Sequence, residues 1–233
     1  MSESRPAPNR LDLSTLEMIL AVAAISLHDF LLSDALSLPA ALKHSMLIYL
    51  RSWDLIVSGL EYFVPFVVFI LLIVLWLLKR NDRVRSLAMI YLGWVTLRLV
   101  LKVMLVLSLV VARQKVLLSV LLKDTVVLWF VIMLLFSIWY WIIDRGGPHA
   151  RRTAIQQRPD FGFPQQVNAI YGWKDWEPGF WDYVFLGFSG STQFSFSDSF
   201  PLSLPAKFLL MLQATLSILV IVFIASIAAG AIH

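Results

Sequence analysis

Residues 125–143 read TVVLWFVIMLLFSIWYWII, nineteen consecutive positions without a charged side chain. The hydrocarbon core of a bilayer is about 30 Å thick, and a helix of about 20 apolar residues crosses it. This stretch therefore predicts a membrane-spanning helix. Similar apolar stretches at about 54–78, 86–111 and 206–231 predict three more.

The composition of the whole chain also indicates a membrane protein. Of the 233 residues, 59% are apolar and 15% are charged. One soluble core of this size could not hide that much apolar surface, whereas a bilayer accepts it. Cysteine is absent, which excludes disulfides, thiolate metal sites and thiol nucleophiles. The net charge of +4 lies in loops, so it indicates membrane topology rather than nucleic-acid binding.

A further helix is expected at about 13–32, after an N-terminal tail at 1–12. Its start resembles a signal peptide, because Arg5 and Arg10 precede an apolar run. Glu17 interrupts that run, however, and the small-residue site Leu38-Pro39-Ala40 is weak. We therefore expect the helix to be retained, as part of an N-terminal helical region that extends over 13–124.

The segment between 125–143 and 206–231 changes character along its length. Its first part, from Asp144 to Gln166 within an expected loop at 144–177, is polar and rich in turn formers, so it predicts a surface loop. Residues 178–200 are instead too apolar for a free loop and too short for a span. They predict a segment that dips into the membrane and returns, which we treat with its flanking helices as one module over 125–233.

The dipping segment is predicted to begin with a short helix. Glu177-Pro178 is a helix-start signal, since proline suits the first turn, and an apolar helix then runs to about Ser191. A short polar hairpin follows, made of Thr192, Gln193, Phe194, Ser195, Phe196, Ser197 and Asp198. A short helix of this kind would point its negative carboxyl end at the membrane interior, where a cation would otherwise be desolvated.

From Phe180 to Ile232 the chain resembles the pore loop and inner helix of the tetrameric potassium-channel superfamily, whose filter reads Thr-Thr-Val-Gly-Tyr-Gly-Asp. Aligned on the final aspartate, Thr192 and Gln193 fall on the threonines, Phe194 on valine and Phe196 on tyrosine. Ser195 and Ser197 fall on the two glycines, and Asp198 on the aspartate. The resemblance implies a homotetramer in a cell (inner) membrane, with monovalent cations as the permeating partners.

A closer resemblance, from about Trp139 onward, is to an uncharacterised bacterial multi-pass membrane-protein family. Its motifs are Trp-Tyr-Trp at 139–141, Asp-Arg-Gly-Gly-Pro at 144–148, Pro-Asp-Phe-Gly-Phe-Pro-Gln at 159–165 and Pro-Gly-Phe-Trp-Asp-Tyr at 178–183.

The two serines are the main departure from a potassium filter. That filter uses glycine in left-handed backbone conformations, where a residue with a Cβ costs on the order of 1 kcal/mol. We therefore expect a weakly selective cation path lined by hydroxyls, or a vestigial pore. Simpler interpretations also stay open: Asp198 as a turn residue, Thr192 and Gln193 as helix caps, and the aromatic residues as an interfacial belt.

Charged residues inside the predicted spans form a second candidate site. Arg98 and Lys102 are four residues apart on one helix face, without the repeat of a voltage sensor. Glu61 lies at a similar depth on the neighbouring antiparallel helix, so we favour a structural Lys102–Glu61 ion pair over a substrate-binding role.

Loop charges predict the orientation. With five spans, twelve Lys and Arg residues lie on the side of the dipping segment and five on the other. The positive-inside rule places the majority in the cytoplasm, so the loop would enter from the cytoplasmic side, as in channels related to glutamate receptors. Potassium channels insert theirs from outside.

Taken together, the sequence predicts an all-α membrane protein with about five transmembrane helices plus a re-entrant pore helix and filter-like loop. The favoured function is a homotetrameric cation pore, and the alternative is a non-conducting scaffold or sensor with the same fold. A transporter would show internal repeats, which we do not find. The sequence has no His-rich metal site, catalytic triad or phosphate loop, so we expect no enzyme activity and no cofactor.

Overall fold

The computed structural model describes residues 13–26, 51–111, 118–152, 158–167, 176–192 and 199–230. The side chains of residues 51–62 and of most residues from 105 to 121 lie outside this description. The described part is mostly helical, with one small antiparallel strand pair.

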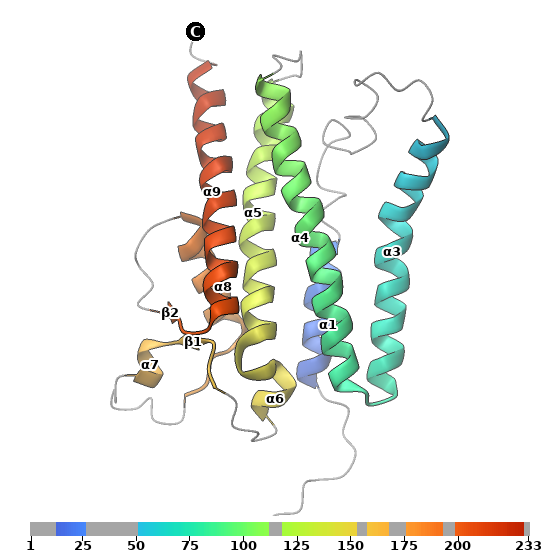
Figure 1. The fold of residues 1–233 in the computed structure, drawn as a ribbon, viewed down its shortest axis with the longest axis vertical. Helices are drawn as coiled ribbons and strands as arrows, with labels where there is room; N and C mark the ends of the chain where they lie inside the picture. Colours follow the sequence, from blue (N-terminus) through green and yellow to red (C-terminus); the bar gives the residue numbers. More distant parts are fainter. Residues whose placement is uncertain are drawn as a thin grey trace, which may run out of the picture.

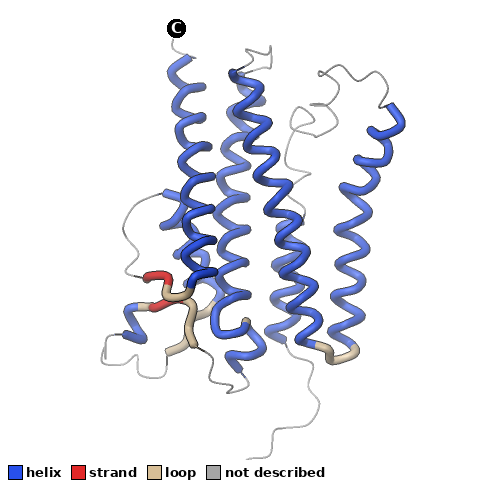
Figure 2. The backbone as a smooth tube through the Cα atoms, viewed as in Figure 1, coloured by secondary structure: helices blue, strands red, loops and turns tan. Residues whose placement is uncertain are grey.

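Five helices run side by side along the long axis of the molecule (Figure 1). They are α1 (Leu13–Ser26), α3 (Arg51–Leu77), α4 (Asn81–Val111), α5 (Leu118–Ile143) and α9 (Leu204–Gly230). The shorter elements gather near the end where α9 begins (Figure 2). They are a 3₁₀ turn (Asp144–Gly146), α6 (Pro148–Arg152), β1 (Phe161–Gly162), α7 (Pro164–Val167), α8 (Phe180–Thr192) and β2 (Phe200–Pro201).

Three helices are long and apolar enough to cross a membrane: Asn81–Met104, Leu122–Gly146 and Leu204–Ser226. They confirm the apolar helices expected at 86–111, 125–143 and 206–231. The stretch expected at 54–78 is also helical, as α3, and its fully described apolar part is Phe63–Leu77. The helix expected at 13–32 is described only as far as Ser26.

A tight turn makes α3 and α4 antiparallel neighbours. Lys79 adopts a left-handed conformation with φ of 56°. The Lys79 N–H donates to Trp76 O at 2.9 Å, and the Arg80 N–H donates to Leu75 O at 2.9 Å. This pair of bonds satisfies the last carbonyls of α3, as in a Schellman motif. Because α4 starts at Asn81, the two helices pack against each other.

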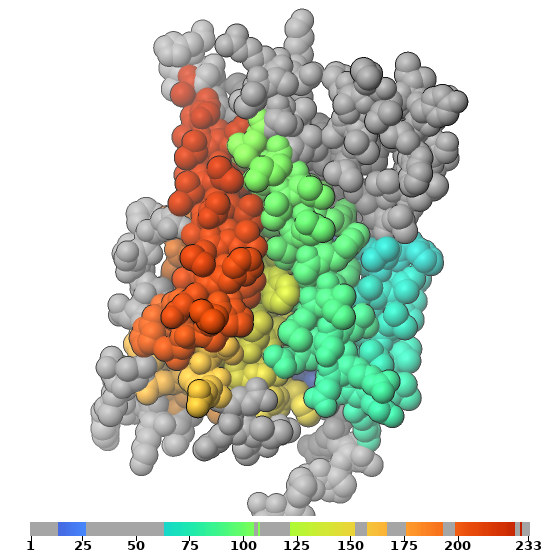
Figure 3. All heavy atoms as spheres, in the orientation of Figure 1, coloured from blue at the N-terminus to red at the C-terminus, as the bar shows by residue number. Residues whose placement is uncertain are grey.

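The packing is centred on α5, which contacts α1, α4, α8 and α9. Its side chains Leu128, Ile132, Leu135, Phe136 and Tyr140 are fully buried. The outer faces of α3, α4 and α9, which form much of the surface seen in Figure 3, are apolar instead. Their large exposed side chains include Phe63, Phe66, Ile90, Leu97, Phe208, Met211 and Val222. So much exposed apolar surface is typical of helices that face lipid.

Candidate functional site: the half-length helix α8 and its anchors

The short helix expected from Pro178 to about Ser191 is present as α8, from Phe180 to Thr192. The carboxylate Oδ2 of Asp182, in its first turn, accepts the Gly179 N–H at 2.7 Å. This bond satisfies a donor at the helix start and places negative charge at the positive end of the helix. With 13 residues, α8 is about 20 Å long, which is too short to cross a hydrocarbon core of about 30 Å.

Contacts with α5 fix where α8 begins and ends. Near its start, the Tyr183 hydroxyl donates to Asp144 Oδ2 at 2.5 Å, just beyond the carboxyl end of α5. At its last turn, the Trp129 indole N–H donates to Ser191 O at 3.4 Å. Along the chain Tyr183 precedes Ser191, whereas its partner Asp144 follows Trp129, so α8 runs antiparallel to α5.

The chain on both sides of α8 lies at the same end of the bundle (Figure 1). Strand β1 precedes α8 and pairs with β2, which follows it, through Phe161–Pro201 and Gly162–Phe200. The Leu202 N–H also donates to Asp160 O at 2.8 Å. At Gly162 an added Cβ would lie 2.7 Å from the Phe200 ring, so the absence of a side chain there lets the ring pack against the strand. The two ends of the segment are therefore joined beside the start of α9.

Only the first residue of the filter-like sequence is described. The Thr192 hydroxyl donates to Phe188 O at 3.0 Å and to Ser189 O at 3.4 Å, within its own helix. This contact corresponds to the helix-capping interpretation of Thr192. The remaining candidates, Gln193, Phe194, Ser195, Phe196, Ser197 and Asp198, lie outside the described residues.

Asp144 is the centre of a buried network at the start of α8. Its side chain is fully buried, and Oδ1 accepts the backbone N–H groups of Asp160 at 2.8 Å and Phe161 at 3.3 Å. With Tyr183 on Oδ2, three donors satisfy a carboxylate that is excluded from water, as a buried charge requires. One side chain thus joins α5, β1 and α8.

Arg151 closes this network from α6. Its Nη1 donates to Asp144 O at 2.7 Å and to Trp141 O at 2.9 Å, and the guanidinium lies 5.4 Å from the centre of the Tyr183 ring. Burial lowers the pKa of the Arg151 guanidinium, while nearby Tyr183 and Asp144 act in the opposite direction. Because an arginine pKa normally exceeds 12, Arg151 stays charged.

The expectation of a polar surface loop from Asp144 to Gln166 is wrong for its described core. Asp144, Phe161 and Phe163 are buried. The turn after α5 has positive φ values of 49°, 77° and 92° at Arg145, Gly146 and Gly147. A Cβ at Gly147 would lie 3.0 Å from Ile142 O, which explains the Gly-Gly pair. The turn at 145–147 therefore reverses the direction of the chain in a buried region rather than at the surface.

A second network lies deeper in the bundle, around Gln213 of α9. The buried Tyr140 hydroxyl of α5 donates to Gln213 Oε1. Gln213 Nε2 donates to Gly187 O at 2.6 Å and to the Ser191 hydroxyl at 2.7 Å, both on α8. Gln213 was not among the residues expected from the sequence, although a lone amide in an apolar span is itself a signal for a functional or structural contact.

The charged residues expected inside the spans are described in part. Lys102 is buried, with 5% of its surface exposed, and the Arg98 guanidinium carbon lies 4.6 Å from the centre of the Trp94 ring. Glu61 belongs to α3, the antiparallel neighbour of α4, but its side chain lies outside the described residues. The Lys102–Glu61 ion pair therefore stays a prediction.

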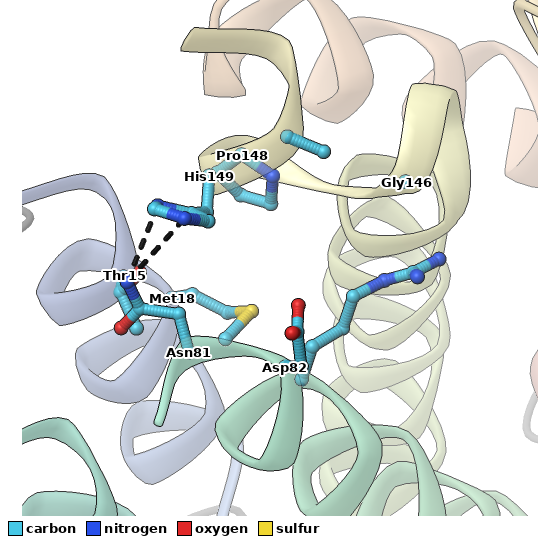
Figure 4. Close-up of a pocket in the computed structure, with 9 residues that line it drawn as sticks. Thr15, Met18, Asn81, Asp82, Gly146, Pro148 and His149 are labelled. Carbon is cyan, nitrogen blue, oxygen red and sulfur yellow. Dashed lines mark hydrogen bonds between the residues drawn. The ribbon is translucent and has the colours of Figure 1, made fainter. Parts of the chain in front are cut away.

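A small pocket lies where the starts of α1 and α4 meet α6 (Figure 4). The Asn81 amide nitrogen is 3.3 and 3.5 Å from the two ring nitrogens of His149, and the Asp82 carboxylate points inward. The cavity measures about 30 Å³, which is room for water but not for a larger ligand. Within the described residues, no group of three or more His, Cys, Asp or Glu side chains could hold a metal ion.

Comparisons of the chain with protein-family models, with curated proteins and with solved structures gave no match.

Proposed function

We propose that this chain is one subunit of a homotetrameric, pore-loop, ion-channel-like membrane protein. In this proposal α1, α3, α4, α5 and α9 cross the membrane, and the dipping segment, residues 178–200, enters and leaves on one side. One observation carries the proposal: α8 starts at the end of the bundle where α9 also starts, yet it ends beside Trp129 in the middle of α5.

The position of the carboxyl end of α8 supports a cation pathway. A helix that ends inside a bilayer directs a partial negative charge toward the membrane interior. In this chain, Trp129 and Thr192 already donate to carbonyls of the last turn, and Gln213 donates to Gly187 O. These hydrogen bonds reduce the partial negative charge that the last carbonyls of α8 could offer to an ion. We therefore expect weak cation binding at the end of α8 and assign cation attraction mainly to Asp198.

A tetramer follows from the single dipping segment in each chain. One such segment cannot enclose an aqueous path, and its polar backbone would face lipid at a cost of several kcal/mol per unsatisfied group. Closed rotational symmetry solves this problem by placing the segments of several copies around one axis. We infer four copies because the filter-like sequence resembles that of the tetrameric potassium-channel superfamily.

The distribution of basic residues supports cytoplasmic entry of the dipping segment. The turn from α3 to α4 and the segment after α5 lie at one end of the bundle, where Arg85 Nε donates to Ile142 O at 3.3 Å. Basic residues at this end include Lys79, Arg80, Arg83, Arg145, Arg151, Arg158 and Lys207. The positive-inside rule assigns this end to the cytoplasmic side of a cell (inner) membrane.

The second candidate is a non-conducting membrane scaffold or sensor. It is favoured by the hydrogen bonds at the end of α8, because donors from the same chain satisfy carbonyls that a pore would present to ions or water. In this alternative, α8 is an internal packing element and the filter-like residues have lost their role.

Planar-bilayer recording of the purified protein in mixed potassium and sodium separates the two candidates. A pore gives a cation current with weak discrimination between the two ions, because Ser195 and Ser197 hinder the left-handed backbone of a carbonyl-lined filter. Asp198→Asn should lower that current at low ionic strength, where a charge at the mouth is least screened. A silent, correctly assembled protein supports the scaffold, and anion permeation contradicts the cation proposal.

A further inference from the structure

Gln213 lies far from both ends of α9. It is the tenth residue of that helix, which places it about 14 Å from the helix start, close to the middle of a hydrocarbon core of about 30 Å. Its side chain is fully buried. A polar amide at this depth requires partners inside the protein, because lipid offers none.

The contacts of Gln213 use its hydrogen-bonding groups on three helices. Both N–H groups of Nε2 are engaged by α8, through Gly187 O and the Ser191 hydroxyl, while Oε1 accepts from Tyr140 of α5. An amide has only these two donors and one acceptor oxygen. A displacement of α8 along α9 would break both bonds from Nε2 together.

Two glycines of α8 allow it to pack closely against α5 and α9. A Cβ on Gly190 would lie 2.9 Å from Gln213 Oε1, and a Cβ on Gly187 would lie 2.1 Å from Ser137 Oγ and 2.9 Å from Met133 O. If α8 moved by one residue in either direction, a side chain with a Cβ would occupy one of these positions. Steric contact thus excludes neighbouring registers, and the bonds of Gln213 stabilise the one that remains.

We propose that Gln213 fixes the depth at which α8 ends inside the bilayer, and that it couples the position of α9 to that of α8. Movement of α9 along its axis would then pull the end of α8. This inference rests on the part of the proposed function in which the dipping segment enters the membrane, but it does not require a conducting pore.

The natural absence of cysteine makes this depth measurable with one introduced thiol. Phe188 lies in the last two turns of α8 and is partly exposed on its outer face, so Phe188→Cys reports the position of the helix end. The rate of its modification by a water-soluble maleimide is measured in lipid nanodiscs, where both membrane faces are accessible. In Phe188→Cys alone we expect slow modification, because the thiol lies within the hydrocarbon region.

The second substitution, Gln213→Leu, removes the three bonds, so α8 should shift from its position against α9. We therefore expect the modification rate of the introduced thiol to rise about tenfold or more. Thr215→Val is the matched control, since Thr215 is on the exposed face of α9 and its hydroxyl donates to Met211 O of the same helix. That control should change the rate less than about twofold. If Gln213→Leu does not fold, Ser191→Ala replaces it, and a rise of severalfold is expected because one of the two bonds between Gln213 and α8 is lost.

An unchanged modification rate in a folded Gln213 variant, or in Ser191→Ala when it serves as the replacement, overturns the inference. This outcome leaves the proposed pore intact if wild-type protein still conducts. Conversely, a silent wild-type protein with an accelerated Gln213→Leu reaction removes the pore but keeps the depth assignment. The experiments therefore distinguish failure of the proposed pore from failure of the inferred role of Gln213.

Discussion

Tyr183 supplies one of three donors to the buried Asp144 carboxylate. Tyr183→Phe leaves Oδ2 without this donor, so we expect a loss of about 1–3 kcal/mol in the free energy of unfolding. Thermal melts in mild detergent measure it. Trp181→Phe is the control, because Trp181 lies in the same helix but is 78% exposed. Equal melting temperatures for Tyr183→Phe and wild type would show that the Tyr183–Asp144 hydrogen bond contributes nothing to stability.

Alanine substitutions at two fully buried serines on neighbouring helices are expected to have different effects on stability. Ser191 accepts from Gln213, whereas the Ser217 hydroxyl has no hydrogen-bond partner within the part of the chain that the structure describes. Ser191→Ala should therefore destabilise the protein by about 1 kcal/mol, while Ser217→Ala should be neutral or stabilising. The same thermal melts compare them. A larger loss for Ser217→Ala than for Ser191→Ala would contradict the assignment of these bonds.

At the scale of elements, α3 and α4 are antiparallel neighbours and Lys102 is buried. The predicted ion pair with Glu61 implies that Glu61→Gln leaves a buried ammonium without its counter-charge, at a cost of about 3–5 kcal/mol. The double change Glu61→Gln with Lys102→Met should recover much of that loss. Unfolding of the two single variants and the double variant gives the coupling energy, and additive effects would mean that the two residues do not touch.

Helix positions were the part of the fold that the sequence predicted well. Length and apolar composition are local properties, so α4, α5 and α9 could be read directly, and Glu177-Pro178 marked the start of α8 within two residues. The anchors were missed because they depend on contacts between distant segments. Asp144 and Asp160 are polar residues in turn-rich sequence, and only the fold brings them together with Tyr183.

Short motifs in the second half of the sequence did contain this information. The carboxylate of Asp144, in the Asp-Arg-Gly-Gly-Pro motif, accepts hydrogen bonds from Asp160 and Phe161 of the second motif and from Tyr183 of the third. Tyr140, in the Trp-Tyr-Trp motif, bonds Gln213. The filter-like residues after Thr192 are the opposite case: the sequence singled them out, but Gln193 to Asp198 lie outside the described residues.

At the scale of the whole molecule, the proposed pore requires four copies of the chain. We expect native mass spectrometry in mild detergent to give a tetramer, because a single dipping segment cannot enclose an ion path. Cross-linking in membranes before extraction controls for dissociation by detergent. A stable monomer or dimer in both experiments would exclude the homotetrameric pore.

The central claim is that the dipping segment enters and leaves the membrane on the same side. Single cysteines placed before and after it, Arg158→Cys and Leu204→Cys, test this most directly, because both positions are exposed. Arg80→Cys marks the same end of the bundle, and Ala229→Cys marks the other end of α9. In intact cells and inverted membrane vesicles, a membrane-impermeant maleimide should modify positions 80, 158 and 204 from the cytoplasmic side, and position 229 from outside. Modification of positions 158 and 204 from opposite sides would mean that the segment crosses the membrane, and would contradict the account.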